Sequence, residues 1–274
     1  MMDGEPATAG SVGWDSNLWS LKIHLAGRLR VESADKVVDE RFLYGLQARI
    51  IFALLVLERN RSVHRDELAE ALWPQGLPPR TWEAALRGVI SKVRAFVVAA
   101  GLPEDSALVT VSGGYQLDLP SDVVVDIEYA RSAVEVAEMV LCEGDPASAV
   151  RIAESARAFS ARPFLPHARG LWVDNIRDRL RDVLLWALCI LSEGYAQQCR
   201  YQFAVSAAEA AIALTPFRER TYQLLMRVHA AAGNPAEALR VYDRCRRLLV
   251  EELGVQPAPE IAALYLALLR NVHE

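Results

Sequence analysis

Apolar residues recur every three or four positions over two neighbouring segments in the first half of the chain. One segment runs from about Ala48 to Glu58, and the other from about His64 to Trp73. This spacing is typical of helices that bury one face. The residues that break the pattern next are Pro74, Gly76, Pro78 and Pro79. Since proline and glycine interrupt helices, the pattern predicts two helices and then a turn.

A third apolar pattern predicts a longer helix after Thr81, whose hydroxyl can accept a hydrogen bond from an N–H group at the helix start. The side chains expected to face the core are Ala85, Leu86, Val89 or Ile90, Val93 and Val97. Those expected to face outward are Arg87, Ser91, Lys92 and Arg94. A helix that is apolar on one face and basic on the other can lie in the major groove of DNA.

Short strands are predicted on both sides of these helices. Ahead of them, alternating apolar and polar residues predict strands at 20–26, 29–31 and 37–38. After the third helix, residues 107–119 predict two strands around a turn at Ser112, Gly113 and Gly114, which is a hairpin signal. A small sheet, three helices and a hairpin in this order make up a winged helix-turn-helix.

The second half of the chain predicts helices almost throughout. The expected spans are 127–143, 146–159, 171–199, 202–214, 218–232, 235–252 and 258–271. Helices joined by such short loops are antiparallel neighbours. We therefore expect a mainly α protein. Its expected parts are a disordered tail at 1–18, a winged-helix domain at 19–120 and an all-α domain at 121–274, with a connector at 120–127.

The predicted all-α domain contains an internal repeat. GDPASAVRIAE at 144–154 resembles GNPAEALRVYD at 233–243, and a fainter copy begins at Phe203. If Ala149, Ala204 and Ala238 are equivalent, the last two copies are 34 residues apart, which is the period of tetratricopeptide repeats. Stacked repeats of this kind form a concave binding surface. The alternative is a helical bundle without a groove.

Charge is distributed unevenly along the chain. The 274 residues carry a net charge of −5, which by itself does not indicate nucleic-acid binding. Between Arg41 and Arg94, however, nine basic residues outnumber five acidic ones, a local balance of +4. Phosphate binding depends on the local field rather than on the total charge. A balance of +4 is modest, so it predicts a weak binder or one that binds as a multimer.

The sequence contains no recognisable targeting segment or catalytic motif. It has no run of about 18 apolar residues, no signal peptide and no Cys-x-x-Cys pair, and its four cysteines are scattered as in a cytoplasmic protein. The five histidines form no metal spacing, and no P-loop, Gly-x-Ser-x-Gly or dinucleotide motif is present. We therefore expect a cytoplasmic protein that is not an enzyme and has no catalytic residues, metal, cofactor or membrane partner.

Several motifs together resemble one family of regulators. They are LAGRLRV at 25–31, LAEALWP at 68–74, AALRGVISKVR at 84–94, GGYQLDLP at 113–120 and AGNPAEALRVYDRCRRLLVEELGVQPAPEIAALY at 232–265. The chain is similar, from about Leu21 to Leu269, to the SARP family, the Streptomyces antibiotic regulatory proteins. Members of that family pair an OmpR-type winged helix with a bacterial transcriptional activator domain of tetratricopeptide-like helices.

The resemblance implies a transcriptional activator that binds direct repeats in double-stranded promoter DNA, as a homodimer on the DNA, and recruits the RNA polymerase holoenzyme. The implied DNA-contacting residues are Arg80, Thr81, Arg87, Gly88, Ser91, Lys92 and Arg94 of the third helix, and Ser112 and Gly113 of the wing. The turn at 74–80 is where such domains often meet polymerase. The resemblance also implies a small, two-domain member without the extensions of larger ones.

The sequence departs from the family pattern at three places that bear on DNA binding. Ser112 stands where the wing commonly carries a basic residue, and Val89 where a polar or aromatic residue is common. Gly88 offers no side chain to a base and costs a helix about 1 kcal/mol relative to Ala. These departures favour an alternative function, a tetratricopeptide-like module that binds a protein or ligand and has weak or lost DNA binding.

Overall fold

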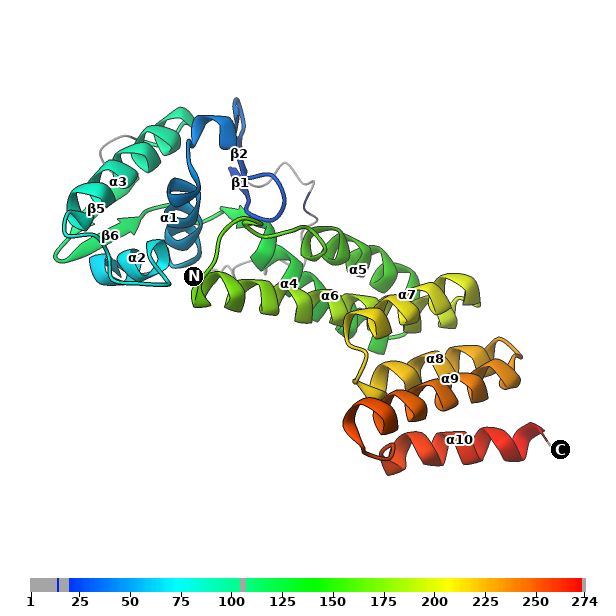
Figure 1. The fold of residues 1–274 in the computed structure, drawn as a ribbon. Helices are drawn as coiled ribbons and strands as arrows, with labels where there is room; N and C mark the ends of the chain where they lie inside the picture. Colours follow the sequence, from blue (N-terminus) through cyan, green and yellow to red (C-terminus); the bar gives the residue numbers. More distant parts are fainter. Residues whose placement is uncertain (1–13, 15–19, 104–106, 273–274) are drawn as a thin grey trace. The chain divides into compact units, whose positions relative to one another are not determined.

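The computed structural model describes Trp14, residues 20–103 and residues 107–272. The chain forms two compact units. Unit 1 comprises residues up to 129 together with 159–180, and unit 2 comprises residues 130–158 and 181–274. The chain is mainly helical, with a winged helix in its first part and stacked helices in its second part, as the sequence predicts (Figure 1).

A four-stranded sheet opens unit 1. Its strands are β1 (Leu21–His24), β2 (Arg30–Ser33), β3 (Val37–Asp39) and β7 (Val124–Val125), in the order β3-β2-β1-β7. The first three are antiparallel neighbours, which confirms the predicted strands. The prediction of a plain connector at 120–127 is wrong, because β7 pairs in parallel with β1. A strand of two residues is too short to show an alternating pattern.

The three helices of the winged helix are α1 (Leu46–Leu57), α2 (Arg65–Leu72) and α3 (Trp82–Ala99). A second sheet in the order β4-β6-β5 is formed by β4 (Val63–His64), β5 (Leu108–Val111) and β6 (Gly114–Leu117). Helix α1 is buried on almost every side, from Ile50 to Val56. Its Phe52 ring packs edge-on against Phe96 of α3, with ring centroids 5.0 Å apart. The buried side of α3 is thus fixed against the core.

Residues 159–180 pack with the winged helix in unit 1. Phe164, Leu165 and Ala168 belong to the same apolar core as the three helices. The Gly27 N–H donates to the Pro163 carbonyl at 2.8 Å, and Phe164 packs edge-on against Trp172. A sequence pattern reports neighbours within one element, so it does not reveal that this later segment completes the core.

Each helix expected in the second part of the chain is present. They are α4 (Asp126–Cys142), α5 (Pro146–Ser160), α6 (Leu171–Gln197), α7 (Tyr201–Leu214), α8 (Glu219–Ala231), α9 (Pro235–Leu248) and α10 (Pro259–Val272). Helix α9 continues into a five-residue π-helical turn, η2 (Leu249–Leu253), which ends at Gly254 with φ 69°. Helices α7, α8, α9 and α10 pack consecutively in unit 2 (Figure 1).

Small residues allow the helices of unit 2 to approach closely. The three alanines assigned to equivalent repeat positions, Ala149, Ala204 and Ala238, are all fully buried. At Gly194 of α6, a Cβ atom would lie only 2.7 Å from the Val150 side chain of α5. Large aromatic residues fill the remaining space, as Tyr222 does at 1% exposure. The tetratricopeptide-like arrangement predicted from the repeat is therefore confirmed.

The predicted disordered tail, 1–18, lies outside the described residues except for Trp14. This side chain is buried in unit 1. Its ring packs on those of His24, Tyr129 and Phe159, with centroids 4.7 to 5.3 Å apart. The Trp14 N–H also donates to the Tyr129 hydroxyl at 3.1 Å. Trp14 is therefore part of the folded core.

Candidate nucleic-acid interface

Helix α3 has one buried and one exposed face. The buried residues are Leu86, Val89, Ile90, Val93, Phe96 and Val97. On the opposite face Arg87, Gly88, Ser91 and Lys92 are exposed. The expectation that Ala85 faces the core is wrong, because Ala85 is exposed. The rest of the predicted division between the two faces holds, apart from Arg94.

The start of α3 leaves polar groups free for a ligand. Thr81 occupies the N-cap position, but its side chain forms no capping hydrogen bond, so the predicted cap is present in position only. The Thr81 carbonyl accepts from the N–H groups of Ala84 and Ala85 at 3.0 and 3.1 Å. Arg80 and Thr81 are both exposed. A helix N-terminus with an exposed hydroxyl and guanidinium suits a phosphate group.

Arg94 is half-buried and already engaged within the protein. Its Nη2 donates to Thr110 Oγ1 at 2.9 Å, and its Nε donates to the Leu108 carbonyl at 3.4 Å. Both acceptors belong to β5, so Arg94 joins α3 to the wing. A residue held in this way positions the hairpin relative to the helix.

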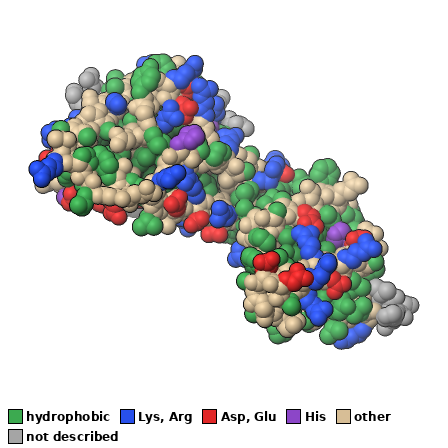
Figure 2. Space-filling view, in the orientation of Figure 1, with side chains coloured by type: hydrophobic (Ala, Val, Ile, Leu, Met, Phe, Trp, Pro, Cys, Tyr) green, Lys and Arg blue, Asp and Glu red, His purple; other side chains and the backbone are tan. Residues whose placement is uncertain are grey.

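The other basic residues of this surface are less constrained. Arg87 lies 3.8 Å from Glu83 on the same helix, and both side chains are more than half exposed, so this pair contributes little to stability. Arg80 and Lys92 form no ion pair with any described residue. On the face shown in Figure 2, basic and acidic side chains are intermingled rather than gathered into one large basic field.

The hairpin of β5 and β6 occupies the position of the wing. Its pairing runs from Leu108 opposite Leu117 to Val111 opposite Gly114, which leaves Ser112 and Gly113 exposed at the tip. Gly113 has φ 80°, a conformation that favours glycine. A Cβ atom on Gly114 would lie 2.2 Å from the Val63 carbonyl oxygen of β4. The two glycines therefore allow the tight turn and the close approach of β4.

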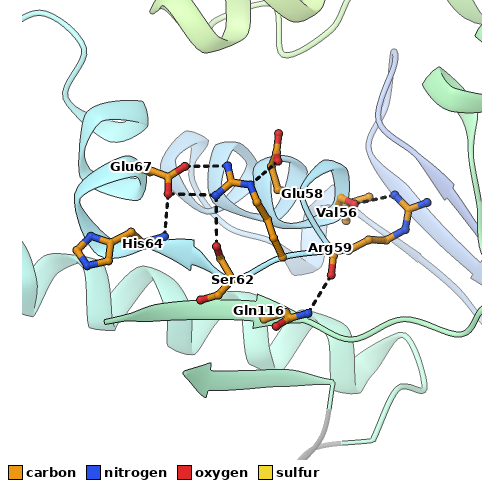
Figure 3. A network of polar contacts seen from close by, with 8 residues as sticks. Val56, Glu58, Arg59, Ser62, His64, Glu67 and Gln116 are labelled. Atoms are coloured by element: carbon orange, nitrogen blue, oxygen red, sulfur yellow. Dashed lines mark hydrogen bonds and ion pairs between the residues drawn. The ribbon is translucent and has the colours of Figure 1, made fainter. Parts of the chain in front are cut away.

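A charged network holds the segment between α1 and α2 (Figure 3). Arg61 donates to Glu58 at 2.9 Å, to Glu67 at 2.8 and 3.1 Å, and to the Ser62 carbonyl at 3.3 Å. The hydrogen bonds from Arg61 hold the pKa of Glu67 below its usual value, and the same contacts raise the pKa of Arg61. Glu67 also accepts from the His64 N–H, which completes a capping box at the start of α2.

The turn between α2 and α3 exposes an apolar side chain beside a shallow pocket. Leu77 is 97% exposed. The pocket has a volume of about 410 Å³ and is lined by residues of α1 and of the turn, including Leu46, Ile50 and Trp73. An exposed leucine next to an apolar hollow is a feature of protein contact sites rather than of DNA contacts.

His24 and Asp126 are polar residues buried in unit 1, and no local sequence pattern predicts their burial. His24 occupies a polar position in the alternating pattern of β1, but it is 2% exposed, and its Nε2 lies 3.3 Å from Glu32. Burial, and then the charge of Arg30, lower the pKa of His24 to about 4. The two-residue alternation placed His24 correctly on the second face of β1. It does not show that Trp14 and Phe159 cover that face.

Asp126 is the first residue of α4 and also joins this helix to β1. It is fully buried and accepts hydrogen bonds from the N–H groups of Leu25, Ala26 and Ile127 at 2.8 to 3.0 Å. It therefore ties the end of β1 to the start of α4. Burial raises the pKa of Asp126 to about 6, against the opposing effect of these hydrogen bonds.

Comparison with known proteins gives consistent matches over both parts of the chain. The bacterial transcriptional activator domain matches residues 125–269, which is more than half of the chain. The regulatory protein AfsR of Streptomyces griseus is 33% identical over 83% of this chain and 23% of its own length. The transcriptional regulatory protein MoaR1 of Mycobacterium tuberculosis is 28% identical over 82% of this chain and 72% of its own. The chain thus spans about a quarter of the longer relative, AfsR.

One solved structure has the same fold. It is Mycobacterium tuberculosis EmbR in complex with a low-affinity phosphopeptide, with a TM-score of 0.74 and 24% sequence identity. The similarity covers 92% of this chain and 66% of that one. No helix among the described residues is long and apolar enough to cross a membrane.

Proposed function

This chain belongs to the SARP family of transcriptional regulators that carry a bacterial transcriptional activator domain, and we propose that it acts by binding promoter DNA through α3. The observation that carries this proposal is the exposed face of α3. Arg87, Ser91 and Lys92 project from a helix whose other face is locked in the core. A helix presented in this way fits the major groove.

The surroundings of each candidate residue favour a different role. Lys92 has no ion-pair partner among the described residues, so it is free to contact a phosphate. Arg87, tethered only by the weak pair with Glu83, can turn toward a base, and arginine is well suited to a bidentate contact with guanine. The Ser91 hydroxyl lies near both residues on the exposed face and can donate to a phosphate or to a base. Arg94 orients the wing rather than reading a base.

The remaining predicted residues have backbone or phosphate roles in the proposal. Arg80 and Thr81 would hold a phosphate at the start of α3. Gly88 has open space around it, so the DNA backbone or a base can approach α3 closely there. The wing tip, Ser112 and Gly113, has no basic side chain and would contact DNA only through backbone and hydroxyl groups.

Activation requires a contact with the transcription machinery as well. We infer that the turn at 74–80 meets RNA polymerase, because its Leu77 is exposed beside an apolar pocket. Binding of two copies to promoter direct repeats is part of the same proposal. Binding of two copies compensates for the small number of base-reading side chains on α3, since two linked weak contacts give stronger binding than one.

The test is a fluorescence-anisotropy titration with DNA from upstream of the gene, using Arg87→Ala, Lys92→Ala and the parent protein. Loss of one phosphate contact should weaken binding and reduce the salt-dependence slope by about 1. Loss of a base contact should weaken the free energy of binding by about 1–3 kcal/mol for the specific sequence, and should leave binding to non-specific DNA unchanged. Arg157→Ala on α5, which removes an exposed ion pair with Glu154, is the matched control. If both α3 variants bind as the parent does, the assignment of α3 is wrong.

The alternative function is a helical module that binds a protein and not DNA. The observation that favours it is a groove lined by α4, α6, α8 and α10 in unit 2. The two functions differ in one simple measurement. A protein that gives no gel shift with upstream DNA at low salt, but forms a stable complex with another protein, would be such a module.

A further inference from the structure

Unit 2 contains a groove with a volume of about 1000 Å³, lined by residues of α4, α6 and α8 and by Glu260 of α10. Its apolar lining includes Leu185, Trp186 and Ile190 of α6 and Leu224 of α8. Trp186 is only half-buried. An apolar floor of this kind suits a short segment of another protein surface.

The groove carries charges that the described part of the chain leaves unpaired. Arg220 and Arg227 lie two helical turns apart on α8, so they project from the same face. They are exposed, and their side chains form no ion pair or hydrogen bond with a described residue. Asp182 and Glu193 of α6 and Glu138 of α4 are likewise without ion pairs. The groove therefore presents basic side chains on α8 and acidic side chains on α4 and α6.

A segment with the complementary chemistry lies elsewhere in unit 2. It runs from residue 246 to 255, RRLLVEELGV, and is called the η2 segment here. Val250, Leu253 and Val255 are 38%, 53% and 49% exposed, although apolar. Glu251 and Glu252 are exposed and form no ion pair with a described residue.

The η2 segment has a fixed shape. Gly254 adopts the left-handed conformation, and its N–H donates to the Val250 carbonyl at 3.1 Å. The Val255 N–H donates to the Leu249 carbonyl at 3.3 Å. Since a preformed segment loses little conformational entropy on docking, it is a better ligand than a flexible one. Arg246 and Arg247 precede the segment's acidic pair, so the segment also carries charges of both signs.

We propose that the groove of one copy of this chain receives the η2 segment of a second copy. Leu253 and its apolar neighbours cover the groove floor. Glu251 and Glu252 face Arg220 and Arg227, and the basic pair 246–247 faces the acidic side chains on α4 and α6. Opposite charges meeting around an apolar centre set the orientation of such a contact.

The contact is head-to-tail, because the groove and the η2 segment are different surfaces of each copy. Two proteins on direct repeats are related by translation along the DNA, whereas a twofold dimer matches a palindrome. A head-to-tail contact is therefore the kind that direct repeats require. The inference rests on the proposed function in this respect, since it names the surfaces through which the two copies pair.

The test is sedimentation velocity of the full chain without DNA over a range of concentrations. The groove variant is Arg220→Glu with Arg227→Glu, and the segment variant is Glu251→Arg with Glu252→Arg. Each is expected to remain monomeric where the parent associates. A mixture of the two is expected to associate again, because the intact groove meets the intact segment and the reversed groove meets the reversed segment, each with opposite charges. Arg131→Glu with Arg157→Glu, on α4 and α5, is the control and should associate as the parent does.

The proposal is overturned by any of three results: a parent that stays monomeric at every concentration, variants that associate as the parent does, or a mixture that does not associate. Each variant should keep the parent's circular dichroism spectrum and its binding to DNA with a single repeat. A parent protein that does not bind DNA with a single repeat would instead contradict the proposed function. The two failures are thereby distinguishable.

Discussion

Lys92 and Arg94 are basic residues two positions apart on α3, but their surroundings differ. Lys92 is exposed and unpaired among the described residues, whereas Arg94 donates to Thr110 and to the Leu108 carbonyl. We predict that Arg94→Ala lowers the free energy of unfolding by about 1 kcal/mol through the lost hydrogen bonds. Lys92→Ala should leave stability within about 0.5 kcal/mol of the parent and weaken DNA binding. Urea unfolding measures the stability of each variant, and anisotropy titration measures its DNA binding. A Lys92→Ala variant that loses stability, with an Arg94→Ala variant that does not, would contradict these roles.

Gly88 offers a test in which stability and binding change in opposite directions. A Cβ atom at this position meets nothing within 4 Å. We predict that Gly88→Ala raises the free energy of unfolding by about 1 kcal/mol, since alanine favours the helix. The added methyl group should weaken DNA binding if DNA lies against α3. Thermal unfolding and a gel shift would check this, and stabilisation with unchanged affinity would place Gly88 outside the interface.

His24 and Asp126 titrate in overlapping pH ranges with opposite effects on stability. The pKa of Asp126 is raised from 3.8 to about 6, so its contribution is present at low pH and is lost as pH rises through this range. The pKa of His24 is lowered from 6.5 to about 4, so its contribution is present above pH 6.5 and is lost as pH falls toward 4. In the parent the two effects largely cancel between these limits.

Substitution should reveal each effect separately. His24→Phe leaves Asp126 to titrate alone, so the variant should gain stability on acidification relative to the parent. Asp126→Asn leaves His24, so that variant should lose stability more steeply on acidification. Urea unfolding at several pH values between 6.5 and 4 measures the slopes. Parallel pH profiles for both variants and the parent would mean that neither group titrates in this range.

At the scale of elements, the wing depends on one close backbone approach. A Cβ atom on Gly114 would meet the Val63 carbonyl oxygen at 2.2 Å, so Gly114→Ala must push β4 away from β6. We predict a loss of several kcal/mol in stability or a failure to fold. Gly76→Ala, in the turn before α3, meets nothing within 4 Å and is the control. Equal thermal stability of the two variants would show that β4 and β6 can separate without cost.

Most elements could be predicted because their signals are local. The boundaries of α5 and α10 were placed within a residue or so, since Pro146 and Pro259 begin these helices and an apolar stripe runs along them. The exposed face of α3 followed from the same periodicity. Arg94 shows the limit of this reasoning, because its position between the two faces lets it reach β5 and not only solvent.

At the scale of the whole molecule, the sequence could not reveal which distant segments meet. β7 pairs with β1 about a hundred residues earlier, and residues 159–180 complete the core of unit 1. Such contacts depend on the three-dimensional arrangement and leave no repeating pattern. The family resemblance predicted a DNA-binding face and a helical domain, but the unpaired charges of the unit 2 groove appear only in the structure.

We propose that this regulator recognises specific DNA through α3. The most direct measurement is an anisotropy titration of the parent protein with DNA from upstream of its own gene and with a shuffled control of the same length and composition. Both are measured at low and at physiological salt. We expect tighter binding to the upstream DNA than to the shuffled DNA, with a difference that persists as non-specific binding falls with salt. Equal affinity for the two sequences, or no binding at low salt, would contradict it.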